Sequence, residues 1–134
     1  MQTGMFKVEH IAIWVTDLEK VKNFYIGYFN AIPNNKYVNT KKQFESYFLS
    51  FGGGARIELM RMPSIPLNST DGNTATGLAH FAITVGTEED VNNLTERLRA
   101  DGYTIASEPR RTGDGYYESA VFDPEGNFIE LTAE

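Results

Sequence analysis

The chain contains the same short pattern twice, and this repeat restricts the possible folds more than any other feature. The segment HIAIWV begins at His10, and the segment HFAITV begins at His80, 70 residues later. Each half also ends in a related strand-like segment, RIELM with Glu58 and FIEL with Glu130, and these glutamates are 72 residues apart. The chain is therefore predicted to be a tandem duplication of one structural unit.

Each copy begins with a predicted strand that carries its histidine on the more open face. Residues 8–15 and 78–85 alternate bulky apolar side chains with smaller or polar ones, which is typical of a strand with one buried face. His10 and His80 fall on the other face in both copies. Both imidazole rings are consequently expected to point away from the packed layer.

A helix is predicted directly after each of these strands. Thr16 is the expected N-cap of the first helix, with Glu19 completing a capping box, and Thr87 is the expected N-cap of the second. Each helix carries one apolar stripe, which should pack on the face of the sheet opposite to the histidine. The stripes consist of Leu18, Val21, Phe24, Tyr25 and Tyr28 in the first helix and of Val91, Leu94 and Leu98 in the second.

The predicted fold class is α+β, with two tandem βαβββ modules forming curved, barrel-like mixed sheets, helices outside and a cavity inside. We expect one domain over residues 1–134, with a first module at 5–62 and a second at 77–134. Residues 63–76 are rich in Pro, Ser, Thr, Asn and Gly and are predicted to be a linker, or alternatively a flap over a site. The other strands are expected at 37–38, 44–51, 55–62, 103–107, 117–122 and 128–132, with a glycine-containing loop at 110–116.

Charge and composition exclude several classes of partner. The net charge is -6 and lysines and arginines form no cluster with aromatics, so nucleic acid is not an expected partner. The chain has no cysteine, which excludes disulfides, thiolate catalysis and cysteine-bound zinc. No apolar run approaches the ~20 residues that span a bilayer, and the N-terminus does not resemble a signal peptide. We expect a soluble, cytoplasmic protein without membrane contact.

The two histidines and the two strand glutamates are the candidate metal ligands. His10, Glu58, His80 and Glu130 occupy equivalent positions in the two copies and are predicted to share one face. Two imidazoles and two carboxylates suit an octahedral Ni, Co, Mn, Fe or Zn ion with positions left open for water or substrate. Such an ion acts as a Lewis acid on a carbonyl oxygen, and Glu58 or Glu130 is then the candidate general base.

Five further residues are candidates for contact with a small-molecule substrate. Aromatic and methionine side chains on the same strands are expected to form the wall of the site. Two neighbouring arginines, close to glycines in the 110–116 loop, suit an anionic substrate group, although a solvated surface loop explains them equally well. The candidates are Trp14, Met60, Phe128, Arg110 and Arg111.

The segments HIAIWVTDLEKVKNFY, RIELM, HFAITV and DPEGNFIEL together resemble the vicinal oxygen chelate superfamily, the glyoxalase/bleomycin-resistance/dioxygenase group. The resemblance implies paired βαβββ modules, a metal at the mouth of the barrel and, frequently, a homodimer. Glyoxalase I has the ligand order His, Glu, His, Glu, and those positions are His10, Glu58, His80 and Glu130 here. In glyoxalase I the ligands of one site come from two chains, so a site within one chain and a site across a dimer both remain open.

The leading functional hypothesis is a glyoxalase-like lyase or isomerase that acts on a small carbonyl compound through a metal-stabilised enediolate. Trp14 stands where glyoxalase I-like chains carry an arginine that binds a glutathione carboxylate, so glutathione hemithioacetal is not the assumed substrate. Proton abstraction next to a carbonyl, as in methylmalonyl-CoA epimerase, stays open as the reaction.

Two other functions of the same family are alternative hypotheses. A metal-free drug-binding protein of the bleomycin-resistance type would use aromatic residues, namely Trp14, Tyr47, Tyr117 and Phe128, to line a groove for a flat ligand. An extradiol dioxygenase uses two histidines and one glutamate for iron and a further histidine for acid-base chemistry. This chain has only two histidines, which makes the dioxygenase the weakest of the three hypotheses.

Overall fold

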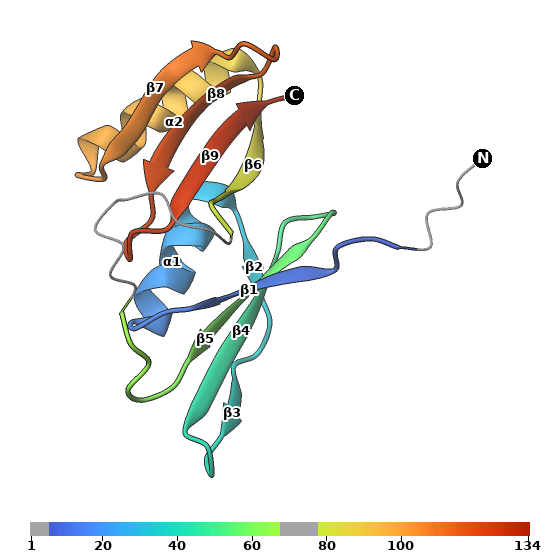
Figure 1. Cartoon of the computed structure of the whole chain (residues 1–134), viewed down its shortest axis with the longest axis vertical. Coiled ribbons are helices and arrows are strands. Elements are labelled where there is room, and N and C mark those ends of the chain that lie inside the picture. The colour runs from blue at the N-terminus through green and yellow to red at the C-terminus, as the bar shows by residue number, and fades with distance from the viewer. Residues whose placement is uncertain (1–5, 68–77) are drawn as a thin grey trace. The chain divides into compact units, whose positions relative to one another are not determined.

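The computed structural model describes residues 6–67 and 78–134, and the chain divides into two compact units, Met1–Pro66 and Leu67–Glu134. Each unit contains one mixed sheet and one helix that contacts it (Figure 1). The predicted α+β class is confirmed. Most of the predicted 63–76 linker lies outside the described residues, and the predicted module bounds stay predictions.

The first unit has the βαβββ order of the prediction, with one additional short strand. Its parallel pair, β1 with β5, forms one side of the sheet, and β4 continues it in antiparallel fashion in the order β1-β5-β4-β2, while β3 also pairs with β4. The elements are β1 (His10–Trp14), α1 (Leu18–Phe29), β2 (Ile32–Pro33), β3 (Tyr37–Asn39), β4 (Phe44–Ser50) and β5 (Arg56–Arg61).

The second unit repeats this plan. Its strands follow the order β6-β9-β8-β7, with β6 parallel to β9 and the other neighbours antiparallel. Helix α2 contacts all four strands, and Figure 1 shows it running along one face of the sheet. The elements are β6 (Phe81–Gly86), α2 (Glu88–Ala100), β7 (Ile105–Arg111), β8 (Tyr117–Phe122) and β9 (Phe128–Ala133).

The apolar stripe of α1 is buried as predicted, but its cap is a different residue. Leu18, Val21, Phe24 and Tyr25 are almost fully buried, and Tyr28 is half-buried. The N-cap is Asp17 rather than Thr16, because the Asp17 carboxylate accepts the Lys20 backbone N–H at 3.0 Å. The predicted Thr16–Glu19 capping box was therefore wrong.

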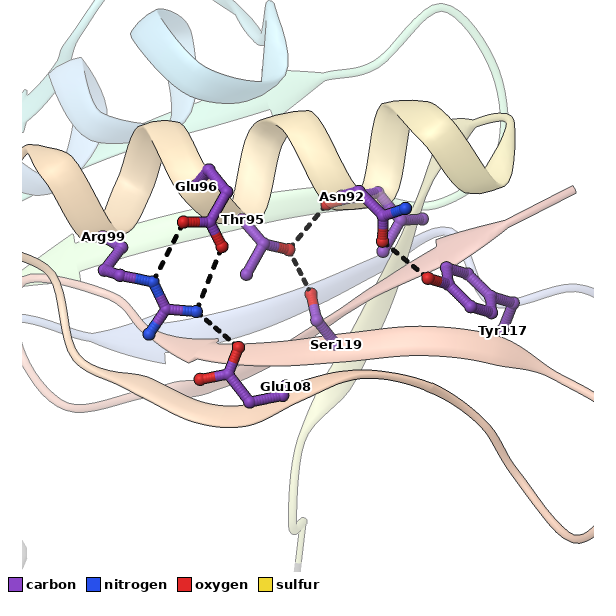
Figure 2. A network of polar contacts seen from close by, with 8 residues as sticks. Asn92, Thr95, Glu96, Arg99, Glu108, Tyr117 and Ser119 are labelled. Carbon is purple, nitrogen blue, oxygen red and sulfur yellow. Dashed lines mark hydrogen bonds and ion pairs between the residues drawn. The ribbon is translucent and has the colours of Figure 1, made fainter.

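Helix α2 begins as predicted. Thr87 is the N-cap, and it forms a reciprocal capping box with Asp90. Among the helix residues that face the sheet, Val91 and Leu98 are fully buried, and so is Thr95, which the apolar stripe did not include. Figure 2 shows the Thr95 hydroxyl between the helix and the sheet, hydrogen-bonded to Ser119.

Strand β7 extends further than predicted. Arg110 and Arg111 lie in this strand and pair with Glu118 and Tyr117, whereas the sequence placed them in a loop. The antiparallel pairing tolerates Pro109 because β7 is an edge strand with an irregular register.

None of the helices in the described residues has both the length and the apolar composition of a membrane-spanning segment.

Candidate metal centre

The two parallel strand pairs place a glutamate beside a histidine in the same way. In the first unit, Ala12 of β1 lies opposite Glu58 of β5, and in the second unit Ala82 of β6 lies opposite Glu130 of β9. Each histidine is two residues before that alanine, so its side chain is on the same face as the glutamate. The small alanine leaves space for the carboxylate to approach the ring.

Each histidine forms a close pair with the glutamate of its own unit. The Nε2 atom of His10 is 3.7 Å from Oε1 of Glu58, and the Nε2 atom of His80 is 3.2 Å from Oε1 of Glu130. Two atoms that bind one ion at right angles, each about 2.1 Å from it, lie about 3 Å apart. Either pair therefore has a separation suited to two neighbouring ligands of one divalent ion.

The four predicted ligands occur in the structure as these two pairs, one in each unit. Across residues 6–67 and 78–134, no three or more His, Asp or Glu side chains gather into a group that could hold a metal ion. The histidine side chains are each 39% exposed, and the glutamates 16% and 20%, so all four groups remain accessible. The four-ligand site itself stays a prediction.

A carboxylate and an arginine surround the ring of His10. Glu9 Oε1 lies 2.8 Å from His10 Nδ1, and Arg56 donates two hydrogen bonds to the same carboxylate, both at 2.7 Å. These bonds, first that from Arg56 and then that from His10, lower the pKa of Glu9 to about 2. Phe48 completes the environment, with its ring edge-on to His10 at 5.2 Å between centroids.

The ring of His80 has an apolar neighbour instead. Phe128 packs against it with 5.6 Å between ring centroids. A further carboxyl group, Glu118 of β8, lies near Glu130, and burial followed by the proximity of Glu130 raises the pKa of Glu118. The second unit therefore presents two acidic side chains on its histidine face, one of which resists ionisation.

Two of the five predicted substrate contacts lie in the first unit, on the histidine face. Trp14 and Met60 lie opposite each other in the β1–β5 register, on the same side as His10 and Glu58. Trp14 is 44% exposed, and its ring is edge-on to Phe44 with 6.1 Å between centroids. The third, Phe128, lies on the histidine face of the second unit, where its ring packs against His80.

The two predicted arginines lie on opposite faces of their sheet. Arg110 shares the side of Glu118, and it donates a hydrogen bond to Ser107 Oγ at 2.9 Å. Arg111 instead lies on the helix side, where it pairs with Glu88 and lies over the Tyr117 ring. The two guanidinium groups are thus not arranged to bind one anionic group together.

Two aromatic residues named for a flat-ligand groove also face the helices. The Tyr47 hydroxyl donates a hydrogen bond to Glu19 of α1 at 2.8 Å. The Tyr117 hydroxyl donates one to Asn92 of α2 at 2.6 Å, as Figure 2 shows. Trp14 and Phe128 lie on the histidine faces, so the predicted groove does not combine these four residues on one surface.

Three residues of the candidate site escaped the sequence analysis. Glu9 and Arg56 could have been found from their positions, because one directly precedes His10 and the other comes two residues before Glu58. Glu118 could have been found from strand alternation, which places it on the face opposite to Ser119 and Tyr117. In each case a charged residue stands beside a predicted ligand.

Relatives of known sequence match almost the whole chain. A lactoylglutathione lyase of Arabidopsis thaliana, GLX1, is 31% identical over 131 residues, which is 91% of this chain and 42% of that protein. The uncharacterized protein YwkD of Bacillus subtilis is 32% identical over 126 residues, 92% of this chain and 94% of its own. The chain thus spans less than half the length of the first relative and nearly all of the second.

Solved structures share the fold. Glyoxalase I from Zea mays superposes with a TM-score of 0.77 and 25% identity, over 94% of this chain and 44% of that one. The family model of the Glyoxalase/Bleomycin resistance protein/Dioxygenase superfamily matches residues 7–131. The chain belongs to the Glyoxalase/Bleomycin resistance protein/Dioxygenase superfamily.

Proposed function

We propose that the protein is a metal-dependent lyase or isomerase that acts on a small carbonyl compound. The observation that carries this proposal is the pair of His–Glu contacts, His10 with Glu58 and His80 with Glu130, formed in the same register in both units. Similarity to proteins named lactoylglutathione lyase and glyoxalase I supports the choice of chemistry.

The donor set fits a divalent ion such as Ni, Co, Mn, Fe or Zn. Each pair offers one imidazole nitrogen and one carboxylate oxygen at a separation suited to neighbouring ligands. Buried or half-buried carboxylates require a partner, and a cation supplies one. The ion, when bound, supplies Lewis-acid polarisation of a carbonyl oxygen.

The remaining chemistry belongs to residues of the chain. Glu58 or Glu130 is the proposed general base, since each is half-buried and lies on the open face with its histidine. Trp14, Met60 and Phe128 are proposed to contact the apolar part of the substrate and to limit the entry of water. Arg110 is the proposed contact for an anionic group. It lies on the same face of its sheet as Glu118, which is also the face that carries Glu130.

The first test is metal content and turnover. Purified protein is reconstituted with each of the five metals, analysed by plasma mass spectrometry and assayed with methylglyoxal plus thiol cofactors. We expect stoichiometric metal in the wild type and loss of it in His80→Ala and Glu130→Gln. A metal content that stays far below stoichiometric after reconstitution rejects the proposal.

The matched control is Glu108→Gln. Glu108 is an exposed strand carboxylate that pairs with Arg99 of α2, as Figure 2 shows. Its replacement removes one negative charge without touching the candidate ligands, so metal content and turnover should be unchanged. Equal losses in Glu108→Gln and Glu130→Gln would show that net charge, rather than ligation, controls metal binding.

We propose further that the chain forms a homodimer, and mixing of variants tests whether a site is built across it. His10→Ala and His80→Ala each damage one pair, so neither protein alone has an intact set of four ligands. If each site combines the first unit of one chain with the second unit of its partner, the mixed dimer regains one intact site. Metal content and turnover would then recover on mixing, whereas sites within single chains predict no recovery.

A second candidate function, a metal-free binder of flat molecules, is favoured by one observation. Trp14, Phe44 and Tyr37 form a chain of ring contacts, with centroid separations of 6.1 and 6.0 Å, and Trp14 and Tyr37 are about half exposed. Exposed rings of this kind stack on planar ligands. Thermal-shift screening separates the two functions, because large shifts with aromatic drugs and none with metals would favour the binder.

A further inference from the structure

The two histidines are held by different kinds of neighbour. The residue before His10 is Glu9, and the residue before His80 is Ala79. The residue two positions before Glu58 is Arg56, and the equivalent position before Glu130 is Phe128. An ionic pair therefore surrounds the first ring at positions where the second ring has two apolar residues.

The direction of the hydrogen bond at His10 follows from the state of Glu9. Arg56 donates from Nε to Oε2 and from a terminal nitrogen to Oε1 of Glu9, which marks the carboxylate as ionised. An ionised carboxylate only accepts hydrogen bonds. The 2.8 Å contact between Glu9 Oε1 and His10 Nδ1 is consequently a bond that Nδ1 donates.

That proton decides which ring nitrogen is free. A neutral imidazole with its proton on Nδ1 has a lone pair on Nε2. In His10 it is Nε2 that faces Glu58, at 3.7 Å. Free neutral histidine prefers the opposite tautomer, so the contact with Glu9 selects a form that would otherwise be the minor one.

The pair that selects this tautomer is itself firmly placed. The Arg56 backbone N–H donates to the Glu9 carbonyl oxygen at 2.9 Å, and Arg56 lies directly opposite His10 in the β1–β5 register. The Arg56 guanidinium also stacks over the Phe48 ring, 4.2 Å from its centroid. Backbone pairing and stacking thus both hold the arginine where it binds the carboxylate.

We propose that Glu9 and Arg56 are positioning residues that fix His10 as the Nδ1–H tautomer, with Nε2 ready to bind a cation, whereas the His80 ring lacks such an ionic pair at the equivalent positions and lies against Phe128 and Glu130. The role assigned to this tautomer, metal binding through Nε2 of His10, rests on the proposed function. The tautomer itself is tested independently of that function, because it is measured in metal-free protein. Carboxylate partners of this kind orient metal-binding histidines in many sites.

The test is long-range ¹H–¹⁵N NMR of tag-free, ¹⁵N-labelled, metal-free protein at a pH where both rings are neutral. The chain has two histidines, and His80→Ala assigns them. We expect His10 to carry its proton on Nδ1 in the wild type. In Glu9→Ala the proton should move mainly to Nε2, and Glu9→Gln, whose amide oxygen still accepts, should retain more of the Nδ1–H form.

The His80 ring, in the second unit, serves as the internal control, since unfolding of the whole chain would disturb its signals as well. Arg56→Met should weaken the preference at His10 and leave the His80 signals in place. The double variant Ala79→Glu/Phe128→Arg should move the His80 ring toward the Nδ1–H form. A wild-type His10 with its proton on Nε2, or an unchanged His10 spectrum in Glu9→Ala, would overturn the proposal.

Metal titration then separates this proposal from the proposed function. Glu9→Ala should weaken metal affinity roughly 10–100-fold without abolishing it, as loss of such a partner typically does. A protein that binds no metal but shows the Glu9-dependent tautomer retains the positioning pair and loses the function. A protein that binds metal with equal affinity in wild type and Glu9→Ala retains the function and loses the positioning role.

Discussion

Glu130 lies opposite Ala82 in the parallel pairing of β6 with β9. This register brings the Glu130 carboxylate to the ring of His80, two residues before Ala82, with 3.2 Å between Oε1 and Nε2. A slip of one residue would send the carboxylate to the helix side of the sheet. The site therefore depends on strand register, and the buried neighbours Ile129 and Leu131 hold that register because they fill the core beneath α2.

Two glycines should respond in opposite ways to alanine. Gly86 has φ +125°, and a Cβ there would lie 2.3 Å from a carboxylate oxygen of Asp90, the partner of Thr87 in the α2 capping box. Gly86→Ala should lower the free energy of unfolding by about 1–3 kcal/mol. Gly27 lies in α1 with open space around its Cα, so Gly27→Ala should raise the free energy of unfolding by up to about 1 kcal/mol.

Denaturant unfolding of both glycine variants checks this prediction. The same substitution is made twice, so any general effect of an added methyl group is controlled. A Gly86→Ala protein as stable as the wild type would show that the start of α2 can relax around the added methyl group.

Breaking the buried hydroxyl pair between α2 and β8 should lower the free energy of unfolding by more than one ordinary hydrogen bond contributes. Thr95 and Ser119 are each 1% exposed, and their hydroxyl oxygens are 2.7 Å apart (Figure 2). Thr95→Val leaves the Ser119 hydroxyl without this partner, which should cost about 1–3 kcal/mol. Adding Ser119→Ala removes the stranded group, so the double variant should lose less than the sum of the two single losses.

A double-mutant cycle by chemical denaturation measures that coupling. Strictly additive losses would mean that the two hydroxyl groups contribute independently, and the interpretation of the pair as one unit would then be wrong.

Glu19 should make stability depend on acidity. The hydrogen bond from Lys22, with smaller contributions from Tyr47 and Lys36, lowers the pKa of Glu19 to about 2. A carboxyl group whose pKa falls on folding stabilises the protein above its unfolded pKa, and this contribution is lost as the pH falls toward the folded value. Because the group is 48% exposed, the effect should be about 0.2–1 kcal/mol.

Glu19→Gln tests this contribution. The glutamine side chain would keep an acceptor for the Tyr47 hydroxyl but lose the charge that attracts Lys22 and Lys36. The variant should be less stable than the wild type at pH 7, and the difference should vanish near pH 2 and shrink in high salt. A difference that is constant across pH and salt would assign the effect to packing.

The repeat, the strand alternation and the helix positions were open to prediction from the sequence because each has a local signal. The faces of His10 and His80 follow from alternation alone, and Thr87 follows from its place just before the apolar stripe of the second helix. The cap at Asp17 was missed because adjacent Thr and Asp are both good caps, and only the final backbone geometry chooses between them.

Relations between strands were harder to predict than the strands themselves. The end of β7 was misplaced because Pro109 and two following glycines look like a loop, while pairing with β8 continues past the proline on an edge. The contact of Glu9 with Arg56 joins residues 47 positions apart, and only the β1–β5 register brings them together. Properties of this kind depend on tertiary pairing and leave no local pattern.

The most direct test of the proposed metal centre is a crystal structure of protein reconstituted with Ni²⁺ or Co²⁺, with anomalous diffraction locating the ion. We predict one anomalous peak about 2.0–2.2 Å from Nε2 of His10, Nε2 of His80 and a carboxylate oxygen of Glu58 and of Glu130, supplied by one chain or by two. Four side chains that lie apart from one another and from every anomalous peak, with no symmetry-related chain uniting them, would contradict the account.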